Sequence, residues 1–154
     1  MKYELKKEQQ LHCDIHTAWD FFSSPGNLAK ITPESMKFKV LTEMKDHSIY
    51  EGMIIDYKVS PMLGILVDWR TKITQVEFEK SFTDFQVIGP YKLWNHFHEF
   101  IPNKDGVLMK DTVTYELPMG ILGDLVHWML VKNKLKQIFN YRYKVLEELF
   151  KSNN

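Results

Sequence analysis

Two histidines alternate with other residues in the segment Trp94-Asn-His96-Phe-His98. Side chains two residues apart lie on the same face of a β-strand, so His96 and His98 are expected to point the same way. An imidazole can bind a metal ion, or it can exchange a proton near neutral pH when a carboxylate fixes its tautomer. The spacing therefore indicates a metal site or an acid–base pair, provided that carboxylates lie beside the rings.

A predicted hairpin brings one such carboxylate into reach. The residues 102–106, Pro-Asn-Lys-Asp-Gly, are typical of a tight turn, because Gly106 can take a positive φ. The turn joins predicted strands at 91–101 and 107–117. With the turn at 103–106, four pairs of residues face each other across the hairpin: Trp94 with Tyr115, His96 with Val113, His98 with Asp111, and Phe100 with Met109.

The apolar side of the last strand decides which face of the hairpin points inward. Met109 and Val113 share a face with Asp111, whereas Lys110 and Thr112 lie on the other. We therefore expect the face with the two histidines to be internal. The alternative is a slip of one residue, which would exchange the faces of the 91–101 strand and turn the histidines outward.

Two further predicted strands extend the internal face. The strand at 82–88 adds Asp84 and Gln86, and the long strand at 66–78 adds Trp69. Buried polar groups need partners or an occupied cavity, since each unpaired one costs about 1–3 kcal/mol. A few convergent polar groups among apolar ones are typical of a small-molecule site. The candidate ligand-binding residues are Trp69, Phe82, Asp84, Gln86, Trp94, His96, His98, Phe100, Met109, Asp111, Val113 and Tyr115.

The order of the predicted elements gives the fold class. A strand at 2–13 precedes two short helices, Asn27–Ile31 and Thr17–Phe22, the latter capped by Thr17 and Asp20. Strands follow between residues 37 and 117, and the apolar spacing becomes helical from Met119 to about Phe150. Grouped strands and a separate long helix indicate an α+β fold with an antiparallel sheet. A helix about 45 Å long requires a sheet that curls around it and leaves a space between the two.

The same segments resemble a known superfamily. Residues 82–100, with Asp84, Gln86, Gly89-Pro90, Trp94, His96 and His98, resemble the bacterial SRPBCC branch of the START-like superfamily. Asp111, Leu117-Pro118 and Tyr141-Arg142 continue the match, which covers nearly the whole chain. Relatives in this superfamily include pollen-allergen-like, polyketide cyclase/dehydrase-like and lipid-transport proteins. The resemblance implies a helix-grip fold, with a seven-stranded sheet wrapped around a long C-terminal helix, and it implies ligand binding more than catalysis.

Composition limits the other classes of function. The 154 residues fit one domain, 1–154, and 20 basic against 20 acidic residues argue against a general binder of nucleic acid or anionic membranes. A single cysteine, Cys13, and a charged start without an apolar signal segment favour a cytoplasmic protein. The apolar segment 121–131 is too short to cross a bilayer. We expect the loop at 61–66 and the short helices to cover it.

Three hypotheses of function follow. The first is binding or transport of a small hydrophobic molecule in the cavity between sheet and helix. The second is a cyclase- or dehydratase-type enzyme on a polyketide-like substrate, with His98 or His96 as acid or base beside Asp111. The third is a protein-interaction domain that acts through its surface. We expect no metal and no cofactor, because the third metal ligand is conjectural and no cofactor motif occurs in the sequence.

Overall fold

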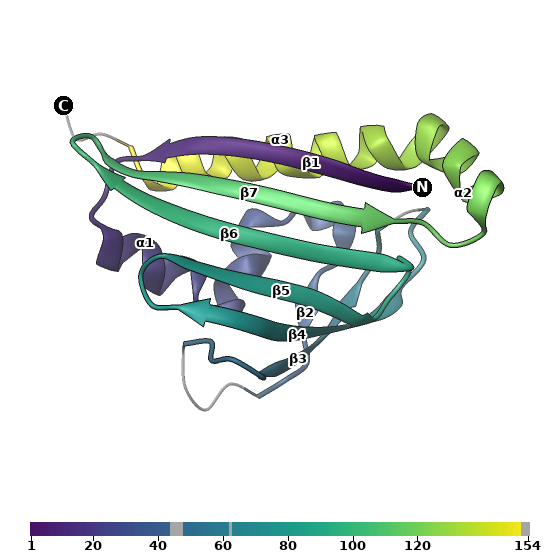
Figure 1. The fold of residues 1–154 in the computed structure, drawn as a ribbon, viewed down its shortest axis with the longest axis horizontal. Helices are drawn as coiled ribbons and strands as arrows, with labels where there is room; N and C mark the ends of the chain where they lie inside the picture. Colours follow the sequence, from purple (N-terminus) through teal and green to yellow (C-terminus); the bar gives the residue numbers. More distant parts are fainter. Residues whose placement is uncertain (44–47, 62, 152–154) are drawn as a thin grey trace.

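A curved antiparallel sheet is the main element of the protein (Figure 1). The computed structural model describes residues 1–43, 48–61 and 63–151. Within these ranges the sheet has seven strands in the order β1-β7-β6-β5-β4-β3-β2. Their bounds are β1 (Lys2–Leu11), β2 (Lys39–Val40), β3 (Ile54–Val59), β4 (Val67–Glu77), β5 (Ser81–Ile88), β6 (Leu93–Asn103) and β7 (Gly106–Glu116).

The predicted register of the β6–β7 hairpin is confirmed. His98 pairs with Asp111 and His96 with Val113, and the strands turn through the two residues between Asn103 and Gly106. Gly106 has φ +125°, and a side-chain carbon there would lie 2.2 Å from the Leu11 carbonyl oxygen. A side chain would therefore clash with the first strand, which explains the glycine.

The helices after β1 differ in detail from the prediction. Helix α1 (Ile15–Phe22) begins two residues earlier than expected, because Asp14 is its N-cap and accepts a hydrogen bond from the Thr17 backbone N–H at 2.8 Å. The second short helix is a 3₁₀ helix, η1 (Pro25–Ile31), and a further 3₁₀ turn, η2 (Glu34–Met36), follows it. The expected capping box of Thr17 and Asp20 is therefore wrong.

The C-terminal helix has three parts. Helix α2 (Gly120–Val126) leads through a π-helical turn, η3 (His127–Val131), into α3 (Lys132–Leu149). In the π turn, His127 stacks on Tyr3 with ring centroids 3.5 Å apart and hydrogen-bonds to the Tyr115 hydroxyl at 2.8 Å. The expected helix is present, and these contacts tie its first half to β1 and β7.

Apolar side chains fill the two ends of the space between the sheet and α3. One buried cluster includes Trp19, Phe100 and Leu146, and the other includes Val113 and Leu135. The histidines of β6 lie along the strand between Trp94 and Phe100. The core therefore supports the polar cluster from both ends.

Two leucines of α3 provide a test of this core. Leu146 is buried and Leu149, three residues later, is about half exposed. We expect Leu146→Ala to lower the free energy of unfolding by about 2–5 kcal/mol, because it leaves a cavity. Leu149→Ala should change the same free energy by about 0.5 kcal/mol or less, apart from a small helix-propensity effect. Urea unfolding of both variants checks the prediction, and equal effects would contradict this placement of the core.

The prediction that the loop at 61–66 and the short helices cover segment 121–131 is wrong. Ile121 is 88% exposed and Trp128 is 75% exposed, although both are large and apolar. The buried positions of this stretch are Gly123, His127 and Val131, which face the sheet. In the loop between β3 and β4, the described residues Leu63 and Ile65 are themselves exposed. No helix among the described residues is long and apolar enough to span a bilayer.

Candidate functional site

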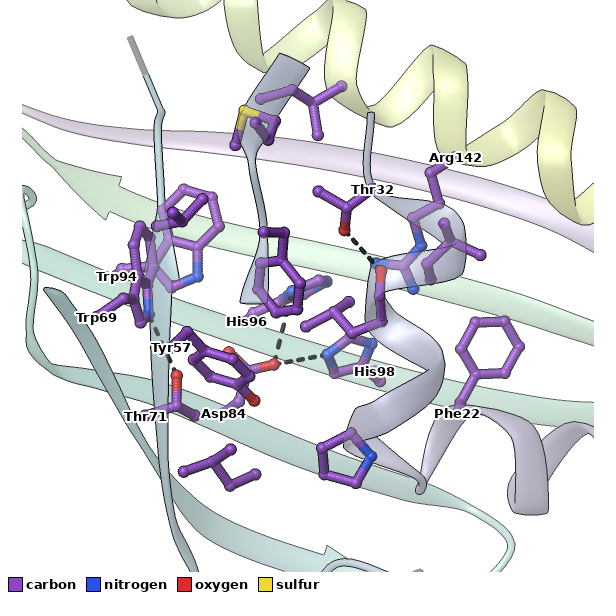
Figure 2. A pocket seen from close by; sticks show the side chains of 18 of the residues that line it. Phe22, Thr32, Tyr57, Trp69, Thr71, Asp84, Trp94, His96, His98 and Arg142 are labelled. Atoms are coloured by element: carbon purple, nitrogen blue, oxygen red, sulfur yellow. Dashed lines mark hydrogen bonds and ion pairs between the residues drawn. The ribbon is translucent and has the colours of Figure 1, made fainter. Parts of the chain in front are cut away.

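A pocket of about 200 Å³ lies between the sheet and α3. Trp69, Trp94 and Phe82 line it from the sheet, and Phe139 lines it from α3. Trp69 and Trp94 meet edge to face, with ring centroids 5.4 Å apart, and Trp69 Nε1 donates to the Thr71 hydroxyl at 3.2 Å. Most of the wall is therefore aromatic or aliphatic, with the indole N–H groups partly satisfied within it (Figure 2).

The polar part of the wall is a cluster centred on His98. Its Nε2 lies 2.8 Å from Asp84 Oδ2, and its Nδ1 lies 2.9 Å from Asp111 Oδ1. The first contact has hydrogen-bond geometry, whereas the second is close but poorly aligned. Asp84 comes from β5 and Asp111 from β7, so the strand order places one carboxylate on each side of the ring.

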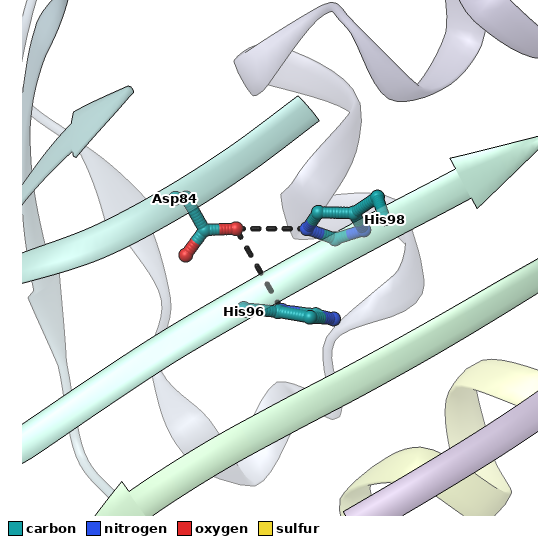
Figure 3. Close-up of side chains that lie close together, drawn as sticks. All are labelled: Asp84, His96 and His98. Carbon is teal, nitrogen blue, oxygen red and sulfur yellow. Dashed lines mark hydrogen bonds and ion pairs between the residues drawn. The ribbon is translucent and has the colours of Figure 1, made fainter. Parts of the chain in front are cut away.

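His96 occupies a less symmetrical position. Its Nε2 lies 2.9 Å from Asp111 Oδ1, but its Nδ1 lies 3.7 Å from Asp84 Oδ2. Its ring lies against that of His98, with centroids 3.7 Å apart (Figure 3). A second positive charge in this stack would face repulsion, so the two histidines have different tendencies to hold a proton.

Arg142 of α3 contacts the cluster from the helix, opposite the strands that carry the histidines and carboxylates. Its Nη2 lies 3.3 Å from Asp111 Oδ2, and its guanidinium carbon lies 5.6 Å from the Phe22 ring centroid. The side chains of Arg142 and Asp111 are both more than nine-tenths buried. A buried carboxylate beside a guanidinium keeps its charge.

Burial and neighbouring charges fix the protonation of the cluster. Burial opposes the ionisation of Asp111, but Arg142 and the two histidines hold the pKa of its carboxyl well below the usual range. Burial also opposes the charge of Asp84, yet the hydrogen bond from His98 and the nearby cations lower its pKa. A carboxyl pKa falls when the surroundings stabilise the ionised form more than the neutral form. Both carboxyls are therefore ionised at neutral pH.

The two histidines shift in opposite directions. Burial disfavours a proton on His98, but its contacts with Asp111 and Asp84 outweigh this and raise the pKa. Burial and the charge of His98 together lower the pKa of His96, against the pull of Asp111. A protonated His98 with a neutral His96 balances the charges, since His98 and Arg142 then match the two carboxylates.

The donor set of Asp84, His96 and His98 bears on the metal question. Their ligand atoms lie within 4.8 Å of one another, so the conjectural third donor does lie beside the two histidines. The imidazole rings are tilted by 33° and their centroids lie 3.7 Å apart. Asp84 and Asp111 already contact the ring nitrogens of the two histidines, so a metal ion would have to displace these contacts. The absence of a metal remains our prediction.

Six of the twelve candidate residues line the pocket. They are Trp69, Phe82, Asp84, Trp94, His96 and His98. Asp84 is the most open of the polar ones, with a side chain 20% exposed, so it is the carboxylate that a bound molecule can reach.

The other six lie outside the pocket lining. Asp111 lies behind the histidines, and Tyr115 hydrogen-bonds His127 farther along the sheet. Gln86 donates to the Tyr91 carbonyl oxygen at 2.7 Å, so its amide holds the turn before β6. The remaining three share the inner face but are enclosed by the core, as their burial shows: Phe100, Met109 and Val113.

Three of the pocket-lining residues that the sequence did not single out come from elements other than the candidate strands. Arg142 and Phe139 come from α3, and Tyr57 comes from β3. A signal for Arg142 was present, because an arginine at an apolar position of a helical repeat needs a buried counter-charge. Tyr57 lies on a strand whose pairing with β4 the sequence did not specify.

Solved structures with this fold are numerous at low sequence identity. The protein TTHA0849 from Thermus thermophilus is 20% identical over 95% of each chain, with a TM-score of 0.71. Major latex-like protein 151 from Panax ginseng is 14% identical over 98% of this chain and 99% of its own, with a TM-score of 0.69. Norcoclaurine synthase from Thalictrum flavum, solved with dopamine and hydroxybenzaldehyde, is 16% identical over 96% of this chain and 88% of its own, with a TM-score of 0.64.

These similarities confirm the helix-grip fold that the resemblance implied. No family model matches the chain, and no curated protein matches it in sequence. At these identities the shared feature is the fold. The function has to be argued from the pocket.

Proposed function

We propose that this protein binds a small, largely apolar molecule in the pocket between sheet and α3. The observation that carries the proposal is an aromatic pocket with a charge-balanced polar cluster on one wall. Apolar pockets with a few convergent polar groups are the usual form of small-molecule sites. A volume of about 200 Å³ suits a ligand of one or two rings, since a cavity of about 150 Å³ holds benzene.

Asp84 sets the polarity of the ligand. It is ionised, its Oδ2 is engaged by His98, and its side chain is partly open to the pocket. A carboxylate only accepts hydrogen bonds, so the matching ligand group is a hydroxyl or an amine. Dopamine and hydroxybenzaldehyde, in the complex of the similarly folded norcoclaurine synthase, are single-ring molecules of this size. The role that fits best is a carrier or binder of a small phenol-, alcohol- or amine-bearing hydrophobic compound.

Replacing His98 tests the role of the polar cluster in binding. Without its imidazole, Asp84 loses the donor at 2.8 Å that holds its carboxylate toward the pocket. We expect His98→Ala to weaken the binding of phenol by about tenfold or more, as the loss of one buried hydrogen-bond partner implies. The tryptophans of the pocket wall, Trp69 and Trp94, provide a fluorescence readout.

The matched control is His12→Ala, because His12 is exposed and is not among the residues that line the pocket. It should leave phenol binding unchanged. Treatment with a chelator should change neither binding nor the melting temperature. Equal binding by the wild type and His98→Ala, with both proteins folded, would contradict the proposed role of the cluster. Native mass spectrometry of the protein from its own host would show a retained ligand as added mass.

The second candidate function is proton-transfer catalysis on the same ligand. It is favoured by one specific feature, a buried histidine held between two carboxylates at the edge of a pocket. His98 would act as the acid, Asp84 would accept a proton from the substrate, and His96 and Asp111 would hold His98 in place. A His98→Gln variant that binds but does not turn over a substrate would separate the enzyme from the carrier.

A further inference from the structure

Helix α2 and turn η3 expose an unusual amount of apolar surface. We call this region the α2 surface, and its exposed residues are Met119, Ile121, Leu122, Leu125, Val126, Trp128, Met129 and Leu130. In the loop between β3 and β4, Leu63, Ile65 and Leu66 are also exposed apolar residues. Large contiguous apolar patches on a protein surface mark interaction sites.

The α2 surface is held in place from its inner side by specific contacts. Gly123 packs so closely that a side-chain carbon would lie 2.1 Å from the Pro118 carbonyl oxygen. His127 is fixed by Tyr3 and Tyr115, and the Tyr3 hydroxyl also donates to Asp124 at 2.7 Å. The helix is therefore anchored through a glycine and polar contacts, while its large apolar side chains point outward.

The width of the apolar arc identifies the kind of partner. At about 100° per residue, the exposed side chains from Ile121 to Leu130 cover roughly 200° of the helix circumference. A helix that packs against one protein surface needs a stripe of only about 100°. An arc twice as wide fits a fluid apolar phase that can follow the curved outer side of the helix, as the acyl boundary of a bilayer interface does.

The local charge agrees with a membrane whose headgroups are anionic. The chain is neutral overall, but residues 119–136 contain three lysines, Lys132, Lys134 and Lys136, against one acid, Asp124. The β3–β4 loop segment 60–67 contains no charged residue. Lysines beside an interfacial helix each add about 1 kcal/mol of attraction to an anionic leaflet. Trp128 is also of the type enriched at the bilayer interface.

We propose that the α2 surface docks this protein on the surface of an anionic lipid bilayer. Val131 and Lys134, which follow it in the chain, line the pocket, as does Pro61 of the β3–β4 loop. Docking therefore brings one wall of the pocket close to the lipid headgroups. Helix α2 lies in the interface and does not cross the membrane.

Vesicle flotation tests the proposal with the full chain. The wild type should bind vesicles of phosphatidylcholine mixed with phosphatidylserine, and added salt should weaken the binding. The variant Leu122→Glu/Trp128→Glu should bind at least about a hundredfold more weakly, because it loses two large apolar side chains. Ile121→Glu provides a second, single substitution. All three positions are exposed, so both variants should fold as the wild type does.

Phe78→Glu/Val87→Glu is the matched control. It changes two exposed apolar residues on the β4–β5 side of the sheet and should leave vesicle binding unaltered. Absence of wild-type binding to these vesicles would overturn the proposal, as would equal binding by the α2 variant. A wild-type dimer in solution that the α2 variant converts to monomers would also overturn it, because a second copy would then cover the surface.

Discussion

Replacing Asp111 with alanine is expected to lower the free energy of unfolding by about 3–5 kcal/mol. Asp111 is buried and lies within 3.3 Å of Arg142 Nη2 and 2.9 Å of both histidines. Its removal leaves the guanidinium buried without its closest counter-charge, and an unpaired buried charge is far costlier than the pair is stabilising. Urea unfolding at neutral pH measures the effect.

Two further variants test whether the loss of stability comes from the unpaired buried guanidinium or from the removal of any acidic side chain. Glu116→Ala removes the acid of the surface pair with Lys92, whose contact is 2.7 Å, and should cost about 1 kcal/mol or less. Asp111→Leu combined with Arg142→Met removes both buried charges and should recover much of the stability. If Asp111→Ala lowers the free energy of unfolding no more than Glu116→Ala does, the cluster is not a buried ionic network.

The hairpin could be predicted from the sequence because local rules determine it. Pro102-Asn-Lys-Asp-Gly106 sets the turn, and the apolar side of β7, with Met109 and Val113, sets which face points inward. Once the turn is placed, the pairing of His98 with Asp111 follows from counting residues along two strands. This is why the polar centre of the site could be named before the structure was known.

The rest of the site depends on long-range packing. Arg142 reaches Asp111 from a helix 31 residues later in the chain, and the rotation of that helix is set by tertiary contacts. Tyr57 enters the pocket only because β3 lies near the end of the curved sheet. Bulges in β4 shift its pairing with β5 after Ile73, so Gln75 is exposed although Thr71 and Ile73 are buried.

The exposure of α2 could not be predicted for a related reason. An apolar segment such as 121–131 is expected to be buried, and the loop at 61–66 and the short helices are neighbours that could cover it. Whether they do depends on where the β3–β4 loop lies, and Leu63 in that loop is itself 85% exposed. The disagreement between an apolar pattern and an open surface is what makes α2 a candidate binding surface.

His96 and His98 are expected to give opposite pH dependences of stability. The pKa of His98 is raised above 6.5 in the folded protein, so its contribution is fully present below pH 6.5 and is lost as pH rises through the raised value. The pKa of His96 is lowered below 6.5, so the unfolded chain takes up that proton more readily and stability falls as pH drops below 6.5.

The pKa values of the two histidines shift in opposite directions because the Asp84 and Asp111 carboxylates lie at unequal distances from their ring nitrogens. His98 has an acidic oxygen within 2.9 Å of each ring nitrogen, from Asp84 of β5 and Asp111 of β7. His96 has one at 2.9 Å and the other at 3.7 Å, and it lies against the His98 ring, whose pKa is raised. Arg142 of α3 is a further cation beside Asp111, so it adds to the repulsion against a second protonated ring.

The measurement is urea unfolding of the wild type, His98→Gln and His96→Gln between ~pH 5 and ~pH 8, where only histidine side chains normally titrate. The stability lost in His98→Gln should be greatest at the acid end and should shrink as pH rises. The stability lost in His96→Gln should shrink, or change sign, as pH falls. His12→Gln, at an exposed histidine, should follow the wild-type curve. Parallel curves for the two buried-histidine variants would mean that the stacked rings share one proton equally, and the assignment of the charge to His98 would then be wrong.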